Sequence, residues 1–370
     1  NCMEQAVKER IEKFASALID QNSAKVIIDP NSNSKGFWFG GGNIIFHNAK
    51  YYLSGRYRDD GDSRTGIGAG ERGLELAIFS SDSVDGPWEK IKSFSKLDLT
   101  HGNENVVSIE GSSLLVTDSG IDLFVSTEKD RPYPDEVIDF QKKGTGIWDI
   151  DLISSSSVEE LEVDNIRRAL RTEELGSLHI KDPFAFNLND NFEGVGLFFC
   201  SHPFTWASSN TGLAIKSAGE KEFTIKSFNA FGRGSSWDVA CARVTDRLEI
   251  PKVGIMEDLP TTLLYFYDGA ECLRSLDESP SAAKRPRGYS CEEIGGIGIG
   301  YEEEFPLINR FSEDFPQFIS PYGTGCSRYV STHITNEGII ATWQQSQNDM
   351  SQPLVSNFLP MERISHIFSS

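Results

Sequence analysis

The chain has 370 residues, with 35 lysines and arginines against 55 aspartates and glutamates, a net charge of −20 and a hydrophobic fraction of 38%. This composition is typical of a globular protein and excludes a chain that is disordered throughout. It also argues against a nucleic-acid partner, because phosphate backbones are bound through basic stripes and the densest basic run here is the short K-R-P-R at 284–287.

The sequence also bears on membrane, compartment and metal. No apolar stretch approaches the roughly 18 residues that a membrane-spanning helix needs, so we expect no membrane partner. No charged and apolar leader is visible, which leaves open whether the protein is cytoplasmic or secreted with its leader removed. The six cysteines have no C-x-x-C spacing and no histidine at zinc-finger distance. We therefore predict free thiols and no metal ligands.

The first predicted element is an amphipathic helix over residues 4–20, in which Ile11, Phe14 and Leu18 recur at helical spacing. We expect residues 1–23 to be a helical extension that packs outside the main body or on a second copy of the chain, forming a homo-oligomer. A second helical segment is predicted over 157–171. The rest of the chain is interpreted as short strands between clusters of turn residues.

These strands recur as a unit of two apolar strands joined by a polar turn, followed by a third strand. Clear copies cover 43–55, 112–127 and 183–201, and weaker copies cover 238–310 and 326–358. Four-stranded antiparallel units repeated in this way are typical of a β-propeller. The last copy lacks an outer strand, which the segment A-K-V-I-I-D at 24–29 would supply, closing a ring.

We therefore predict an all-β fold, a five-bladed β-propeller formed by residues 24–370 as a single domain, preceded by the N-terminal α-helix. A β-sandwich is the alternative. It would explain the alternating strands but not the recurring unit.

Carboxylates recur where the predicted inner strands of three consecutive blades begin, at Glu110, Asp182 and Asp238. Acidic residues are poor strand formers, so their recurrence suggests a function. Inner strands converge on the propeller axis, which would bring these side chains into one funnel. Glycoside hydrolysis needs one protonated and one ionised carboxyl group, and an acidic neighbour separates their pKa values. The alternative is that each residue caps a turn or pairs with arginine.

Four motifs resemble those of the five-bladed propeller glycoside hydrolases of families 43, 32 and 117. They are K-D-P-F at 181–184, E-G-S at 110–112, K-Y-Y-L-S-G at 50–55 and S-D-S-V-D-G-P-W-E at 81–89. The resemblance implies a hydrolase with an Asp base, an Asp that tunes pKa values and a Glu acid. By position Glu110 matches the acid and Asp182 matches an Asp member. The resemblance also implies a structural Ca²⁺ in the central channel and no other cofactor.

The chain departs from the family pattern at two positions. Asn43 stands where the family has its first Asp, and Cys326 stands where a His is common. The order Asp, Asp, Glu on blades one to three becomes Glu, Asp, Asp on blades two to four, so we do not assign a role to each carboxylate.

The remaining candidates would contact a carbohydrate substrate. Arg56 and Arg58 precede a polar, Gly-rich loop at 59–73 that is long enough to line a substrate mouth, and an arginine pair suits a carboxylate or several hydroxyls. Pairing with Asp59, Asp60 or Asp62 is their alternative role. Further substrate-binding candidates are Asn43, His101, Trp237 beside Asp238, and Glu271, which is also a substitute candidate for the acid.

From these features we predict a glycoside hydrolase that cleaves an oligo- or polysaccharide through a carboxylate cluster in the central funnel. The alternative is a non-catalytic propeller that binds a glycan or a protein, and Asn43 in place of an Asp favours it.

Overall fold

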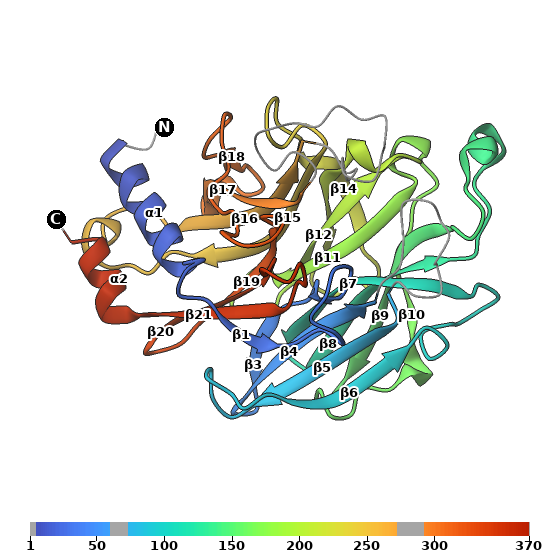
Figure 1. The fold of residues 1–370 in the computed structure, drawn as a ribbon, viewed down its shortest axis with the longest axis horizontal. Coiled ribbons are helices and arrows are strands. Elements are labelled where there is room, and N and C mark those ends of the chain that lie inside the picture. The colour runs from blue at the N-terminus through green and yellow to red at the C-terminus, as the bar shows by residue number, and fades with distance from the viewer. Residues whose placement is uncertain (1–4, 60–72, 272–291, 370) are drawn as a thin grey trace.

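The computed structural model describes residues 5–59, 73–271 and 292–369. Its strands form five antiparallel sheets that follow one another along the chain and are arranged around a centre (Figure 1). A helix at the N-terminus, α1 (Gln5–Leu18), precedes them. The predicted five-bladed β-propeller with an N-terminal helix is confirmed.

Each blade is a meander that runs outward from an inner strand. In blade 1, β2 (Trp38–Gly40) and β3 (Ile44–His47) both pair with β4 (Lys50–Arg58), followed by β5 (Glu75–Ser81) and β6 (Glu89–Ser95). Blade 2 contains β7 (Val106–Thr117), β8 (Gly120–Lys129), β9 (Ile147–Ser155) and β10 (Arg167–Leu170). Blade 3 contains β11 (His179–Asn187), β12 (Val195–His202), β13 (Asn210–Lys216) and β14 (Thr224–Phe231).

The last two blades complete the ring. Blade 4 contains β15 (Cys241–Glu249), β16 (Thr262–Ala270), β17 (Ile294–Tyr301) and β18 (Asn309–Arg310). Blade 5 contains β19 (Ser327–Ile334), β20 (Gly338–Gln345), β21 (Leu354–Pro360) and, as its outer strand, β1 (Lys25–Ile28). Because β1 pairs antiparallel with β21, with Lys25 opposite Ser356, the predicted closing strand is confirmed.

The apolar core lies between neighbouring blades. Separate clusters of buried side chains fill the interfaces of blades 1 and 2, 2 and 3, 3 and 4, 4 and 5, and 5 and 1. Because each sheet is covered on both faces, its middle strands are buried along most of their length, as in β8, whose ten residues are all buried, whereas outer strands such as β6 are largely exposed. Three described cysteines, Cys200, Cys241 and Cys326, are buried free thiols; the other three lie outside the described residues.

The two helices extend the core at the junction of blades 4 and 5. Phe14 of α1 contacts Phe368, which follows α2 (Met361–Ile367), with ring centroids 5.3 Å apart, and the helices lie side by side (Figure 1). Phe14 belongs to the same buried cluster as Trp343 and Leu359. The apolar face of α1 is thus covered within the chain, and a homo-oligomer through this helix, which remains a prediction, would have to use its exposed face. None of the helices in the described ranges is long and apolar enough to cross a membrane.

The predicted helix over 157–171 is wrong. This segment contains a turn, a short 3-10 helix (Val163–Asn165) and β10, whose Arg167 pairs with Leu152 of β9. The apolar residues that suggested a helical face, Val158 and Leu161, are buried in the turn against the core between blades 1 and 2. Tertiary packing thus outweighs local helical periodicity here.

We predict that Phe14→Ala lowers the free energy of unfolding by about 3–5 kcal/mol, because a fully buried ring is replaced by a cavity. Lys13→Ala, on the exposed face of the same helix, is the control and should change it by less than about 0.5 kcal/mol. Urea unfolding followed by tryptophan fluorescence measures both variants. Equal, small effects would contradict the view that α1 is part of the propeller core.

Candidate functional site

All five blades contribute to one small cavity on the propeller axis. Its volume is about 20 Å³, and it is lined by Gly41, Gly42, Asn43, Ser112, Ser113, Asp182, Pro183, Phe184, Val244, Thr245 and Tyr329. Such a volume holds about one water molecule. A sugar ring does not fit in this volume, so a sugar would have to bind outside the cavity, beside the inner-strand residues that line it; we call this place the axial mouth.

The inner strands that surround this cavity have irregular β-pairing. The inner strands of blades 2 to 5 shift register between residues 109 and 112, 181 and 184, 244 and 246, and 328 and 331. Bulges of this kind redirect side chains and are over-represented beside active sites. Glu110, Asp182 and Tyr329 all lie within these shifts, so three side chains leave the regular in-and-out alternation of their strands.

Two of these residues have strained backbones. Asp182 has a φ of 52° and Tyr329 a φ of 57°, in the left-handed region that non-glycine residues rarely occupy. Their side chains meet, with Tyr329 Oη donating to Asp182 Oδ1 over 3.3 Å. Strain of this type persists only where surrounding contacts impose it, and it concentrates at functional sites.

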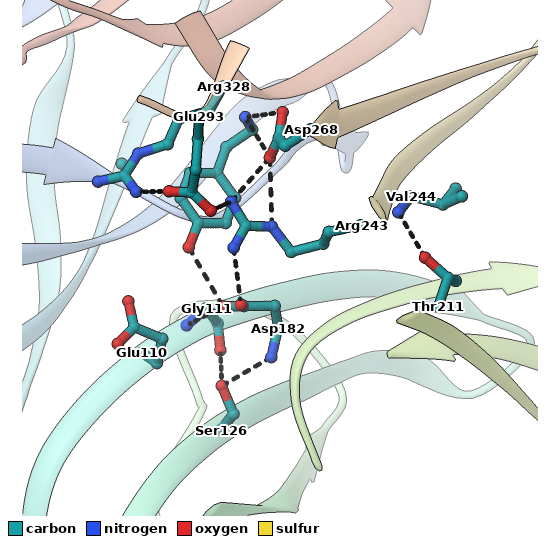
Figure 2. A network of polar contacts seen from close by, with 12 residues as sticks. Glu110, Gly111, Ser126, Asp182, Thr211, Arg243, Val244, Asp268, Glu293 and Arg328 are labelled. Atoms are coloured by element: carbon teal, nitrogen blue, oxygen red, sulfur yellow. Dashed lines mark hydrogen bonds and ion pairs between the residues drawn. The ribbon is translucent and has the colours of Figure 1, made fainter. Parts of the chain in front are cut away.

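Arg243 of β15 holds three carboxylates together (Figure 2). Its Nη1 lies 3.1 Å from Asp182 Oδ2, its Nη2 lies 2.8 Å from Glu293 Oε1, and its Nε and Nη2 lie 3.2 and 2.8 Å from Asp268 Oδ2. Burial raises the pKa of Asp268 despite the opposing effect of the Arg243 guanidinium. The Tyr329 backbone N–H also donates to both Asp268 oxygens over 3.1 Å.

Glu110 and Arg56 form the neighbouring ion pair. Arg56 donates to Glu110 Oε1 from Nε over 3.0 Å and also from Nη2, and its Nη1 donates to the Gly40 carbonyl. Burial favours the protonated form of Glu110, but Arg56, Lys181 and Arg328 together overcome it and lower its pKa to about 2. Its side chain is 16% exposed. Glu110 is thus a charged, partly accessible carboxylate at the mouth.

Arg328 completes the group, which we call the axial cluster: Arg56, Glu110, Asp182, Arg243, Asp268, Glu293, Arg328 and Tyr329. Arg328 pairs with Glu293 through Nη1, and its Nε and Nη2 face the Gln344 amide at 3.2 and 3.0 Å. The guanidiniums of Arg243 and Arg328 lie 4.1 and 5.2 Å from the centre of the Tyr329 ring. Each arginine of the cluster therefore has carboxylate partners within the chain.

The pKa of Glu292, which precedes Glu293 in the chain, is shifted in the opposite direction to that of Glu110. Its burial raises its pKa to about 7, and Arg328, a hydrogen bond with Thr324 and Lys35 oppose the rise only in part. Glu110 is thus ionised at neutral pH, whereas Glu292, which like Glu110 is affected by the charge of Arg328, is only partly ionised there.

Asn43 has a structural role at the axis. Its Nδ2 donates to the Leu114 carbonyl over 2.8 Å and its Oδ1 accepts from the Leu114 N–H over 2.7 Å, joining blade 1 to blade 2. The amide behaves like a neighbouring peptide group, because it offers one donor and one acceptor to the same residue. An aspartate, which has no donor, would not reproduce this pairing.

Asp238 and Trp237 lie in a separate group. Asp238 precedes β15 and accepts from Arg310 Nε over 2.8 Å and from Tyr267 Oη over 2.9 Å. Trp237 is 9% exposed and stacks on Tyr267 with ring centroids 5.5 Å apart. Across the described residues, no hydrogen bond or ion pair joins Asp238 to Glu110 or to Asp182. Glu110 and Asp182 both lie close enough to Arg56 and Tyr329 for their charges to affect the pKa values of these two groups, and Asp238 does not, so two of the three predicted carboxylates share one cluster.

The other predicted contacts are dispersed. His101 Nε2 lies 3.0 Å from Asp151 Oδ1, in a blade 2 network around the buried Lys129. The Arg58 guanidinium lies 4.3 Å from the centre of the Trp38 ring. Glu271 directly follows β16 and is half-buried. Residues 60–72, which contain the proposed partners Asp60 and Asp62 and most of the proposed mouth loop, lie outside the described residues, as does the basic run at 284–287.

Sequence reasoning missed Arg243, Asp268, Glu293, Arg328 and Tyr329. A signal for the two arginines is present, because Cys241-Ala-Arg243 and Cys326-Ser-Arg328 repeat a C-x-R pattern at the start of consecutive inner strands. A charged residue inside an apolar strand indicates a buried partner. Asp268 and Glu293 supply such partners, and they flank the connection from β16 to β17.

The axial residues do not fit a Ca²⁺ site. This ion prefers six to eight oxygen ligands, and Asp182 is the one carboxylate lining the cavity. Its Oδ1 accepts from the Gly111 N–H and Tyr329, and its Oδ2 is paired with Arg243. Within the described ranges, no three His, Cys, Asp or Glu side chains gather as metal ligands would.

No protein-family model and no curated protein sequence matches the chain. Solved structures do match it. One described as a glycoside hydrolase has 12% identity and a TM-score of 0.62, with 96% of each chain covered. A thermostable family-43 glycoside hydrolase has 12% identity and a TM-score of 0.54, with 89% of this chain and 91% of the other covered. An α-L-arabinofuranosidase from Lactobacillus brevis has 10% identity and a TM-score of 0.55, with 89% and 92% covered. At such identities the likeness establishes the fold, and the resemblance to these propellers is confirmed at that level.

We predict that Asn43→Asp destabilises the protein by about 1–3 kcal/mol at pH 7, because a carboxylate oxygen would replace the donor to the buried Leu114 carbonyl. Thermal unfolding measures the change. Asn48→Asp, at an exposed turn where aspartate tolerates the left-handed backbone, is the control and should be nearly neutral. If Asn43→Asp unfolds at the same temperature as the wild type, the hydrogen bonds between Asn43 and Leu114 do not contribute to stability.

Proposed function

We propose that the protein is a glycosidase that hydrolyses a sugar bound at the axial mouth. The observation that carries the proposal is that Glu110 and Asp182, from consecutive blades, belong to one charge-rich cluster around Arg56, in which the N–H of Gly111, next to Glu110, donates to Asp182 Oδ1. The fold is shared with solved glycoside hydrolases, which supports this reaction class by analogy.

The chemistry requires two carboxyl groups with different proton affinities. Glu110 is suited to be the ionised partner, as general base or nucleophile, because its pKa of about 2 keeps it charged. Glu292 is proposed as the proton donor, because it adjoins Glu293 of the axial cluster, is near enough to Arg328 to be affected by its charge as Glu110 is, and has a pKa of about 7 that keeps part of it protonated near neutrality. In glycoside hydrolysis the donor protonates the leaving oxygen while the carboxylate attacks the sugar or activates water.

Asp182 is then the third carboxylate of the site, where its negative charge would stabilise the oxocarbenium-like transition state. Asp238 is proposed to be structural, because its carboxylate accepts hydrogen bonds from Arg310 and Tyr267 of blade 4. A carbohydrate is the proposed partner. One structural neighbour is an α-L-arabinofuranosidase.

The alternative is a non-catalytic glycan-binding propeller, and one observation favours it. The carboxylates of Glu110, Asp182, Asp268 and Glu293 each have an arginine partner. A saturated ion-pair network can be purely structural. Hydrolysis of any glycoside by the purified protein would separate the two functions.

Glu110→Gln is expected to reduce kcat/KM for glycoside hydrolysis by about 10²–10⁴-fold, because the neutral amide cannot act as base or nucleophile. Release of sugar from a panel of aryl glycosides and oligosaccharides measures the loss. Glu89→Gln, at an exposed position of β6, is the matched control and should retain full activity. An active enzyme whose rate is unchanged in Glu110→Gln would remove Glu110 from the reaction.

The proposed pair also predicts a pH profile. Activity should be lost above about pH 7 as Glu292 releases its proton, whereas Glu110 remains ionised down to about pH 2. In Glu292→Gln the rate should fall and the alkaline decline should disappear, as seen in kcat/KM between pH 4 and 9. An unaltered alkaline decline in this variant would assign the proton donor to another group.

A further inference from the structure

We propose that Tyr329 and Arg243 are positioning residues that hold the Asp182 carboxylate in one orientation at the axial mouth. The inference deepens the proposed function, since its kinetic consequence rests on that function. Its structural content concerns contacts among residues of blades 3, 4 and 5 and is independent of any reaction.

The first argument is a closed circuit of contacts. Arg243 pairs with Asp182 and with Asp268, Tyr329 donates from its hydroxyl to Asp182, and Tyr329 donates from its backbone N–H to Asp268. The circuit joins β11, β15, β16 and β19. A carboxylate in such a circuit cannot rotate without breaking a charge-assisted hydrogen bond.

The second argument is that both ends of the Tyr329–Asp182 contact are strained. Each residue has a positive φ within a register shift of its inner strand. A register shift in an inner strand does not by itself require a positive φ, since the inner strand of blade 4 has a register shift but no residue with a positive φ. Within the register shifts of the described inner strands, the non-glycine residues with a positive φ are thus the two whose side chains meet.

The third argument is close packing around the carboxylate. A side chain at Gly111 would place its Cβ only 2.5 Å from Asp182 Oδ1, and Gly111 instead donates its N–H to that oxygen over 3.1 Å. The Asp182 N–H is bound by Ser126 Oγ over 3.1 Å (Figure 2). Gly111 and Tyr329 thus hold Oδ1 while Arg243 holds Oδ2, and of these contacts Tyr329 and Arg243 are the two made by side chains.

A purely structural role would give a different result on mutation. If Tyr329 only packs, then Tyr329→Phe, which keeps the ring among the guanidiniums, should change nothing at Asp182. If the hydroxyl positions Asp182, the carboxylate should adopt a new environment while the fold remains intact.

The experiment compares Tyr329→Phe with wild type in the protein labelled with ¹³C at aspartate carboxyl carbons. The Asp182 signal is assigned by its loss in Asp182→Asn. Tyr301→Phe, which removes the same hydroxyl group from the last residue of β17, is the control. We expect the Asp182 signal to shift or broaden in Tyr329→Phe and to stay unchanged in Tyr301→Phe, with both variants folded by circular dichroism. An unmoved Asp182 signal in folded Tyr329→Phe would overturn the proposal.

A kinetic measurement connects the positioning to the reaction. In an active enzyme Tyr329→Phe should lower kcat by about tenfold or more and change KM by less than about threefold, because misorientation affects the transition state more than substrate binding. Arg243→Lys, which keeps the charge but loses the planar fork, should also lower kcat. A protein without glycosidase activity would contradict the proposed function alone, because the carboxyl signal tests the positioning separately. Unchanged kcat together with a shifted signal would overturn the claim that this orientation matters for catalysis.

Discussion

The ion pairs of Arg243 are the interaction on which the centre of the propeller depends. Five inner strands converge on one axis, and Arg243 of the inner strand β15 contacts three carboxylates there: Asp182, Asp268 and Glu293. Like charges buried in one place cannot all remain ionised without a cation. A planar guanidinium with five donors can bind them together, and a lysine would not offer the same geometry. Arg243 thus joins blade 3 to blade 4, and through Tyr329 to blade 5.

Local charge balance at the mouth contrasts with the acidic chain as a whole. The net charge is −20, yet each carboxylate of the axial cluster faces an arginine. This arrangement separates proton affinities, because Glu110 beside Arg56 is strongly acidic while Glu292, mainly through burial, is not. Acid–base chemistry on a glycosidic bond requires two carboxyl groups whose pKa values are separated in this way. The left-handed backbones of Asp182 and Tyr329 would be the structural cost of that arrangement.

The repeating strand pattern was sufficient to predict the propeller, because a four-stranded meander leaves a periodic signature in apolar residues and turns. It also predicted β1 as the closing strand, since the last repeat visibly lacked one. Glu110 and Asp182 could be selected from the sequence because each lies in the first half of an inner strand, and their catalytic role remains a prediction. Asp238, selected in the same way, lies three residues before β15, which begins at Cys241. The arginines were missed because the circuit depends on register shifts and on contacts between residues 60 to 150 positions apart, such as Arg243 with Asp182 and Tyr329 with Asp182.

Time-resolved ¹H NMR of the purified protein with a panel of glycosides and oligosaccharides tests the central claim most directly. Our account predicts that new anomeric proton signals of a released sugar appear with at least one member of the panel. The first anomer formed would also show whether configuration is retained or inverted. If the folded protein binds a sugar of the panel, as seen in ligand line broadening, and no anomeric signal of a product ever appears, the hydrolase account is contradicted and the axial cluster is a binding site.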